Sequence, residues 1–214
     1  MAFGLAGQPA GASPPSVAQL QVQAAIAQYP KYVIILGDSL LAGAVSPIGG
    51  KGIVNLAEGG ATLEMILRDQ VPQVAGIIAS ALAQFAGVIL MGGSDNLAAI
   101  EAGTETWDQF SASLTSIYKA LIAAGIPANR ILACSPPPTM SEPDFAYVQG
   151  MNAYYVMDAG PFGIGVVNMI QLYTDNTLSF PPNRTYFWSD AVHDGAAVWQ
   201  QVYNPWLGAN VQPW

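Results

Sequence analysis

Short runs of apolar residues alternate along this chain with longer segments in which apolar residues recur every three or four positions. The short runs predict strands at 32–36, 53–56, 88–91, 130–134 and 165–170. The longer segments predict helices at 16–29, 62–84, 106–124, 144–157 and 196–207. Strands separated by helices of this length need right-handed crossovers. The pattern therefore predicts the α/β class, with a mostly parallel sheet covered on both faces.

One stretch imitates a membrane span. Residues 74–93 carry no charge and are as long as the hydrocarbon core of a bilayer requires. Ala86-Gly87 interrupts the stretch, however, and the "VILM" run that follows is typical of a buried strand. We therefore favour a helix followed by an interior strand over a membrane span, with a membrane-associated lipid enzyme as the alternative that this stretch leaves open.

Residues 1–30 contain no charged side chain. The Ala, Gln, Gly and Pro content of residues 1–15 predicts a flexible arm, and Ser16 is a candidate N-cap for the helix that follows. This segment is interpreted either as an extra helix packed on the domain at 31–214 or as an arm that docks into a homo-oligomer or larger assembly. No positive charge precedes an apolar run, so no secretory signal peptide is recognisable, and the protein is expected to be soluble or bound in an assembly.

Composition narrows the classes of function. The 214 residues are 52% hydrophobic and only 9% charged, so part of the surface is expected to be covered by a partner or by copies of the chain. The net charge of −8, with six Lys and Arg in total, argues against nucleic acid as a partner. Cys134 is the only cysteine and His193 the only histidine, so we expect neither a metal site nor a cofactor.

The candidate catalytic residues follow the ends of the predicted strands. Ser39 follows the first strand in "VIILGDSLLAG", and Gly60 and Asp95-Asn96 follow the next two. Ligands of open α/β sheets bind outside the carboxyl ends of the strands, so these residues are expected on one rim. A serine becomes a nucleophile when a base removes its proton and a third group orients that base. His193 supplies the base, and Asp190, three residues earlier, supplies the orienting carboxylate.

Four short blocks of this sequence resemble those of the SGNH, or GDSL-type, esterase/lipase family. They are "GDSL" at 37–40, "NLAEGGAT" at 55–62, "GGSDN" at 92–96 and "DAVH" at 190–193, in the order of the family. The resemblance implies a three-layer α/β/α, flavodoxin-like fold with a mostly parallel five-stranded sheet. It also implies that Ser39 is the nucleophile, with Asp190 and His193 completing the triad. The oxyanion hole would use the backbone N–H groups of Ser39 and Gly60 and an asparagine amide.

The third block departs from the family pattern. The family reads G-x-N-D, whereas this chain reads Gly93-Ser94-Asp95-Asn96. An ionised Asp95 would repel a developing oxyanion, so Asn96 is preferred as the third donor, with the loop shifted by one residue. The other register leaves the hydroxyl of Ser94 as the donor.

The expected activity is hydrolysis of carboxylic esters through an acyl-serine intermediate. We favour a small ester or an acylated carbohydrate, above all an O-acetylated one, because Tyr186, Phe187 and Trp188 could stack on sugar rings, although they could equally be core residues. Two alternatives stay open. The chain could be a structural component of a larger assembly, such as a virion or surface protein, that keeps this fold with reduced or no activity. It could also be a lysophospholipase or thioesterase.

Overall fold

The fold is built on a parallel sheet of five strands in the order β2-β1-β3-β4-β5. The computed structural model describes residues 15–44, 46–174, 177–179, 182, 204–211 and 213–214. The strands are β1 (Tyr32–Gly37), β2 (Gly52–Asn55), β3 (Phe85–Met91), β4 (Ile131–Cys134) and β5 (Gly165–Val167). The expected flavodoxin-like order and parallel sheet are confirmed.

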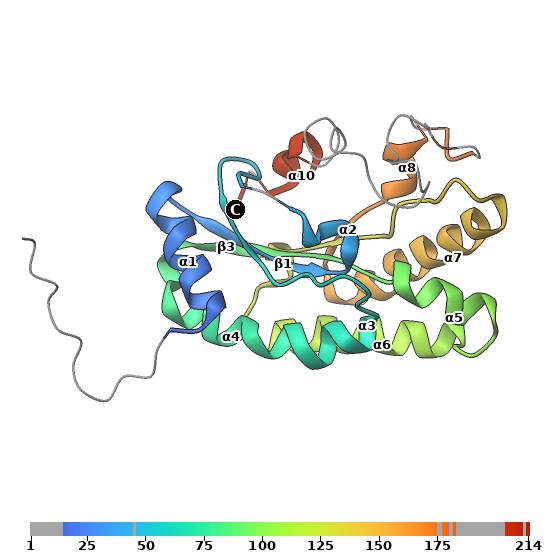
Figure 1. Cartoon of the computed structure of the whole chain (residues 1–214), viewed down its shortest axis with the longest axis horizontal. Coiled ribbons are helices and arrows are strands. Elements are labelled where there is room, and N and C mark those ends of the chain that lie inside the picture. The colour runs from blue at the N-terminus through green and yellow to red at the C-terminus, as the bar shows by residue number, and fades with distance from the viewer. Residues whose placement is uncertain (1–14, 45, 175–176, 180–181, 183–203, 212) are drawn as a thin grey trace, which may run out of the picture.

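Helices cover both faces of the sheet and make three layers (Figure 1). One face packs against α1 (Val17–Gln28), α3 (Leu63–Met65), α4 (Val71–Ser80), α6 (Trp107–Ala123) and α7 (Glu142–Ala159). The other face packs against α2 (Ser39–Ala42), α8 (Met169–Tyr173) and α10 (Asn204–Val211). A further short helix, α5 (Leu97–Glu101), follows β3.

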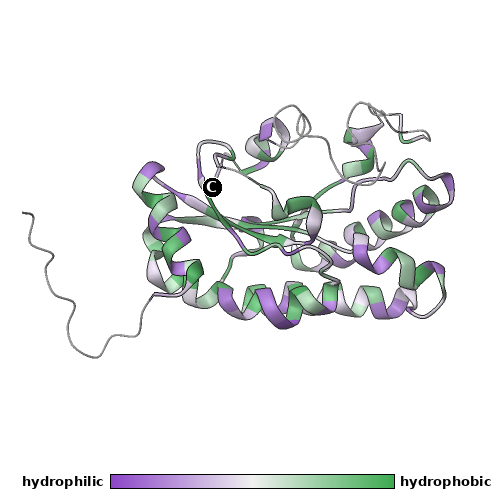
Figure 2. Ribbon diagram, in the orientation of Figure 1, coloured by the Kyte–Doolittle hydropathy of each residue, from purple (hydrophilic) through white to green (hydrophobic). Residues whose placement is uncertain are grey.

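The side chains of β1 show how the two layers are filled. Ile34 and Leu36 belong to the larger apolar cluster under α4 and α6, whereas Val33 and Ile35 belong to the cluster under α2 and α10. Every residue of β1 is buried, so the strand is apolar without alternation, as a central parallel strand must be. Figure 2 shows the same apolar colouring along the strands.

The segment predicted as one helix over 62–84 is interrupted in the structure. α3 passes into a π-helical turn, η1 (Ile66–Gln70), and then into α4. The chain leaves the helix at Ala81, and a 3₁₀ turn, η2 (Leu82–Gln84), leads into β3. Residues 74–93 are thus the end of α4 followed by a buried strand, as expected. No helix in the described part of the chain is long and apolar enough to cross a membrane.

Two predicted strand boundaries are wrong by three residues, whereas the others agree to within one. β3 begins at Phe85, three residues early, because Ala86-Gly87 belongs to the strand and does not interrupt it. Gly87 is needed there, since a Cβ would lie 2.5 Å from the ring of Trp214. β5 ends at Val167 and does not continue to 170, because the Asn168 side chain accepts the Gln171 N–H and caps α8.

The first helix packs on the domain. Ser16 caps α1 by accepting the Gln19 N–H, and the Gln19 side chain accepts the Ser16 N–H in return, which is a capping box. Val22 and Ala25 are buried in the larger cluster. Of the closing helix predicted at 196–207, residues 196–203 lie outside the described residues, and the described part continues to Val211.

Candidate active site

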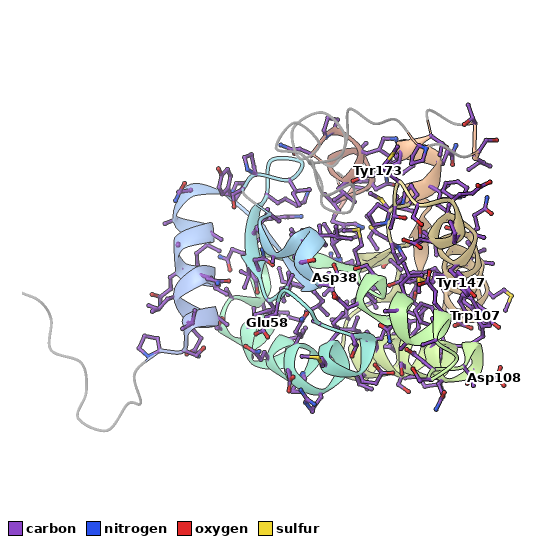
Figure 3. The ribbon with its side chains drawn as sticks, turned by 45° about the vertical axis from the view of Figure 1, so that its right-hand side comes forward. Asp38, Glu58, Trp107, Asp108, Tyr147 and Tyr173 are labelled. Atoms are coloured by element: carbon purple, nitrogen blue, oxygen red, sulfur yellow. The ribbon has the colours of Figure 1, made fainter. Side chains whose placement is uncertain are left out.

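The strand order places the candidate residues at the topological switch point of the sheet. β1 leads outward to β2 on one side, and its neighbour β3 leads to β4 on the other. The crevice between two strands whose connections diverge is where sheets of this type bind ligands. β1 ends directly before Asp38 and Ser39, and β3 ends directly before Gly92. Figure 3 shows Asp38 beside the short helix α2, in the middle of the molecule.

Ser39 is the first residue of α2, and its position is fixed by the residues just before it. Gly37 donates its N–H to Gln70 Oε1 and accepts from Gln70 Nε2, both at 2.8 Å. A Cβ on Gly37 would lie 2.2 Å from the carbonyl oxygen of Met91, so only glycine lets β1 and β3 approach here. Asp38 is fully buried and caps α2, while Ser39 is partly exposed.

The glycine loop of the second block passes beside Ser39. A Cβ on Gly59 would lie 3.9 Å from the Ser39 Cβ, and Gly60 follows in the left-handed region at φ +78°. Asn55 fastens this loop to the end of α2, because its Nδ2 donates to the Leu41 carbonyl at 2.9 Å and its Oδ1 accepts the Ala57 N–H at 3.0 Å. The structure therefore brings the first two blocks together.

The third block reaches the same place from β3. The Tyr155 hydroxyl, on α7, donates to the Gly92 carbonyl at 2.8 Å and accepts the Gly92 N–H at 3.2 Å. Gly93 turns the chain at φ +102° against the ring of Phe110. Ser94 Oγ then donates to Asp38 Oδ2 at 2.5 Å. This hydrogen bond joins the third block to the residue next to Ser39.

Asn96, the preferred third donor, has its amide engaged elsewhere. Its Nδ2 donates to both carboxylate oxygens of Glu105 at 2.9 and 3.0 Å and to Glu64 at 3.3 Å. Its Oδ1 accepts the Leu63 N–H at 3.0 Å. The side chain lies at a hollow of about 500 Å³ between α3, α5 and α6. Both amide hydrogens of Asn96 thus go to the carboxylates of Glu64 and Glu105, which argues against Asn96 as the third donor.

Solved structures with a similar fold include enzymes named as lipases, esterases and an α/β hydrolase. An α/β hydrolase from the metagenome of Lake Arreo matches with a TM-score of 0.63 at 15% identity, over 86% of this chain and 96% of its own. A GDSL-like lipase from Bacteroides thetaiotaomicron matches with a TM-score of 0.59 at 16% identity, over 91% of this chain and 92% of its own. An acetyl xylan esterase from Geobacillus stearothermophilus matches with a TM-score of 0.55 at 16% identity, over 80% of this chain and 90% of its own. The chain has the SGNH hydrolase fold. No protein-family model and no curated protein sequence matches it.

Within this SGNH hydrolase fold, Asp38 is a buried carboxyl of the rim whose pKa is raised. Burial raises its pKa to about 6, against hydrogen bonds from the Ser94 side chain and the Leu40 N–H that lower it, and the charge of Asp95 raises it further. The Leu40 N–H lies 3.1 Å from Asp38 Oδ1. One oxygen of Asp38 thus accepts the N-cap hydrogen bond from Leu40, and the other accepts the hydrogen bond from Ser94.

The structure does not describe every residue of the expected site. Asp190 and His193 lie outside the described residues, as do Tyr186, Phe187 and Trp188. Within the described ranges, no group of three or more His, Cys, Asp or Glu is placed to hold a metal ion.

The sequence interpretation missed Gln70 and Tyr155, which hold the backbone at the ends of β1 and β3. A polar residue on the inner face of an apolar helix could have identified Gln70. Nothing distinguishes Tyr155 from a core aromatic residue until its partner is seen.

Proposed function

We propose that this protein is a serine esterase that hydrolyses carboxylic esters through an acyl-serine intermediate on Ser39. The observation that carries the proposal is the placement of Ser39, partly exposed, beside the Gly59-Gly60 loop at the β1/β3 switch point. The structural neighbours support ester hydrolysis as the class of reaction, because their names are those of lipases, an acylhydrolase and acetyl xylan esterases.

In the proposed reaction His193 takes the proton of Ser39 as its oxygen attacks the ester carbonyl, and Asp190 holds the imidazole in place. The resulting oxyanion accepts hydrogen bonds from the backbone N–H groups of Ser39 and Gly60 and from a side chain of the 92–96 segment. Collapse expels the alcohol, which takes the proton back from His193. A water molecule then attacks the acyl-serine by the same route and releases the acid. Ser94 is the third donor in this proposal, with Asn96 the donor in the alternative register.

A short acyl group is the proposed substrate feature, with O-acetylated carbohydrate as the favoured class. Its support is the acetyl xylan esterase among the structural neighbours. Lysophospholipids and thioesters are the competing substrates. A panel of p-nitrophenyl esters from acetyl to palmitoyl, with an acetylated xylo-oligosaccharide, a lysophospholipid and an acyl-thioester, ranks these classes by kcat/KM.

Ser39→Ala is the variant that tests the proposal on this panel. It should abolish turnover without changing the free energy of unfolding by more than about 0.5 kcal/mol, since the side chain is partly exposed. Ser116→Ala is the matched control, because Ser116 only donates to the Ala112 carbonyl within α6. Hydrolysis that survives in Ser39→Ala, or that is lost equally in Ser116→Ala, would remove the proposal.

The third donor is tested separately. At the pH optimum of the wild type, Ser94→Ala should lower kcat by about 10- to 100-fold, less than the loss seen for a full oxyanion donor in other enzymes. Asn96→Ala should mainly lower stability, because it removes the group that separates the carboxylates of Glu64 and Glu105. A loss of kcat in Asn96→Ala alone would restore the Asn96 register.

A second candidate is a structural component of a larger assembly. The observation that favours it is the outward side of α1, where Val17 is 74% and Leu20 is 50% exposed on the helix that follows the uncharged residues 1–14. Light scattering on full-length protein and on a deletion of residues 1–14 tests it. An oligomer that dissociates in the deletion would support this role, and identical monomers would dismiss it.

A further inference from the structure

Ser94 has one hydrogen to donate, and in this structure that hydrogen goes to Asp38. The distance from Ser94 Oγ to Asp38 Oδ2 is 2.5 Å, and the Asp38 carboxyl is fully buried. An ionised carboxylate only accepts hydrogen bonds, so it takes the single hydroxyl hydrogen of Ser94. A serine that gives its hydrogen to Asp38 has none left for a substrate oxyanion.

Protonation of Asp38 reverses this bond. A protonated carboxyl can donate its own hydrogen to Ser94 Oγ, because Asp38 Oδ1 is already occupied by the Leu40 N–H and Oδ2 faces Ser94. The Ser94 hydrogen is then free to turn to another acceptor, such as a substrate oxyanion. The family's asparagine would not need this step, because an amide nitrogen carries two hydrogens and can serve a carboxylate and an oxyanion at once.

We infer that Asp38 is a positioning residue that gates the oxyanion hole: Ser94 completes the hole only while Asp38 carries a proton. This inference rests on the proposed esterase function. It adds a proton-dependent third donor that arises from the serine at position 94.

The groups around Asp38 allow its carboxyl to titrate within the pH range in which the enzyme can be assayed. Among the described residues, the titratable groups that act on Asp38 are Asp95, whose charge favours the protonated carboxyl, and Tyr155 on α7. Burial raises the pKa of the Tyr155 hydroxyl, so this group stays neutral and does not compete. Burial likewise raises the pKa of Asp38, to about 6. His193, outside the described residues, is the other titrating group of the reaction and must be neutral to act as the base.

The pH profile of kcat/KM therefore has two limbs. The acidic limb belongs to His193, and the alkaline limb reports the ionisation of Asp38 and the loss of the third donor. Because the loss of one weak donor lowers the rate of such enzymes modestly, we expect kcat/KM to fall about 10- to 100-fold on the alkaline side. It ends on a plateau, because the Ser39 and Gly60 N–H groups still act.

Three variants test the gate. In Asp38→Asn the amide oxygen keeps the Leu40 N–H, and the amide nitrogen donates permanently to Ser94. Its alkaline fall should disappear, and at about pH 8 it should be about 10- to 100-fold more active than wild type. Ser94→Asn should lose the fall with Asp38 intact. Ser94→Ala should show the low plateau at every pH. An unchanged alkaline fall in Asp38→Asn would overturn the inference.

A measurement without turnover separates this inference from the proposed function. The ¹³C signal of the Asp38 carboxyl is titrated by NMR in wild type and in Ser94→Ala. Because the Ser94 hydrogen bond stabilises the ionised carboxylate, the pKa of Asp38 should rise in the variant. An unchanged Asp38 pKa would overturn the gate even in an active enzyme. A raised pKa together with no Ser39-dependent hydrolysis on any substrate would confirm the hydrogen bond and refute both the esterase and the catalytic use of the gate.

Discussion

Tyr155→Phe removes a single oxygen that holds the end of β3. The hydroxyl is buried and makes two hydrogen bonds, one to the carbonyl and one to the N–H of Gly92. Phenylalanine keeps the ring and its packing but leaves both backbone groups without this partner. An unsatisfied buried polar group costs about 1–3 kcal/mol, so we expect a loss of about 3 kcal/mol in the free energy of unfolding. For a chain of this size the melting temperature should fall by about 6–12 °C.

Tyr118→Phe is the matched control for this change. Tyr118 lies on the neighbouring helix α6 and is equally buried, but its hydroxyl contacts no hydrogen-bond partner within the described part of the chain. Removing it relieves a polar group buried without compensation, so the variant should be unchanged or about 1 kcal/mol more stable.

Urea unfolding followed by fluorescence gives both free energies under the same conditions. Tyr155→Phe should also lower kcat, because Ser94 follows Gly92 by two residues and the backbone that positions it is no longer held by the tyrosine hydroxyl. Equal stabilities of the two phenylalanine variants would refute the reasoning, since the ring and the burial are the same and only the hydrogen bonds differ.

Three other changes test the contacts that hold Ser39 in place. Gly37→Ala places a Cβ 2.2 Å from the Met91 carbonyl and should cost at least about 3 kcal/mol, whereas Gly76→Ala, in open space on α4, should gain about 0.5–1 kcal/mol in the same urea experiment. Gln70→Ala should cost about 2–3 kcal/mol by the same assay, because both backbone groups of Gly37 lose their partner. The folded-state pKa of Asp38, about 6, lies above the unfolded value of 3.8, so its contribution to stability is fully present below about pH 4 and is lost as the pH rises through 6. Wild type should therefore lose about 2 kcal/mol more than Asp38→Asn between about pH 4 and pH 7, and equal losses would show that Asp38 is not the group responsible.

The periodicity of apolar residues was enough to predict the sheet. The central strands are buried on both faces and therefore read as unbroken apolar runs, which is why β1 and β4 fall where they were expected. The boundary of β3 was missed, because a glycine inside a strand looks like a break until the ring of Trp214 is seen to occupy the space of its side chain.

The placement of the rim could also be predicted, because parallel strands bring their carboxyl ends to one edge. The hydrogen bonds within the rim could not. The hydrogen-bond partners of Ser94 and Asn96 are the carboxylates of Asp38 and Glu105, which come from distant elements. The partnership of Gln70 with Gly37 spans 33 residues and leaves no local pattern.

An activated nucleophile at Ser39 is the central proposal for this protein. The most direct measurement is labelling of the purified protein with a fluorophosphonate probe, read by intact mass, with Ser39→Ala and Ser116→Ala in parallel. The account predicts one adduct on wild type and on Ser116→Ala and none on Ser39→Ala. A folded wild-type protein that takes no label, or a Ser39→Ala variant that takes it equally, would contradict the claim.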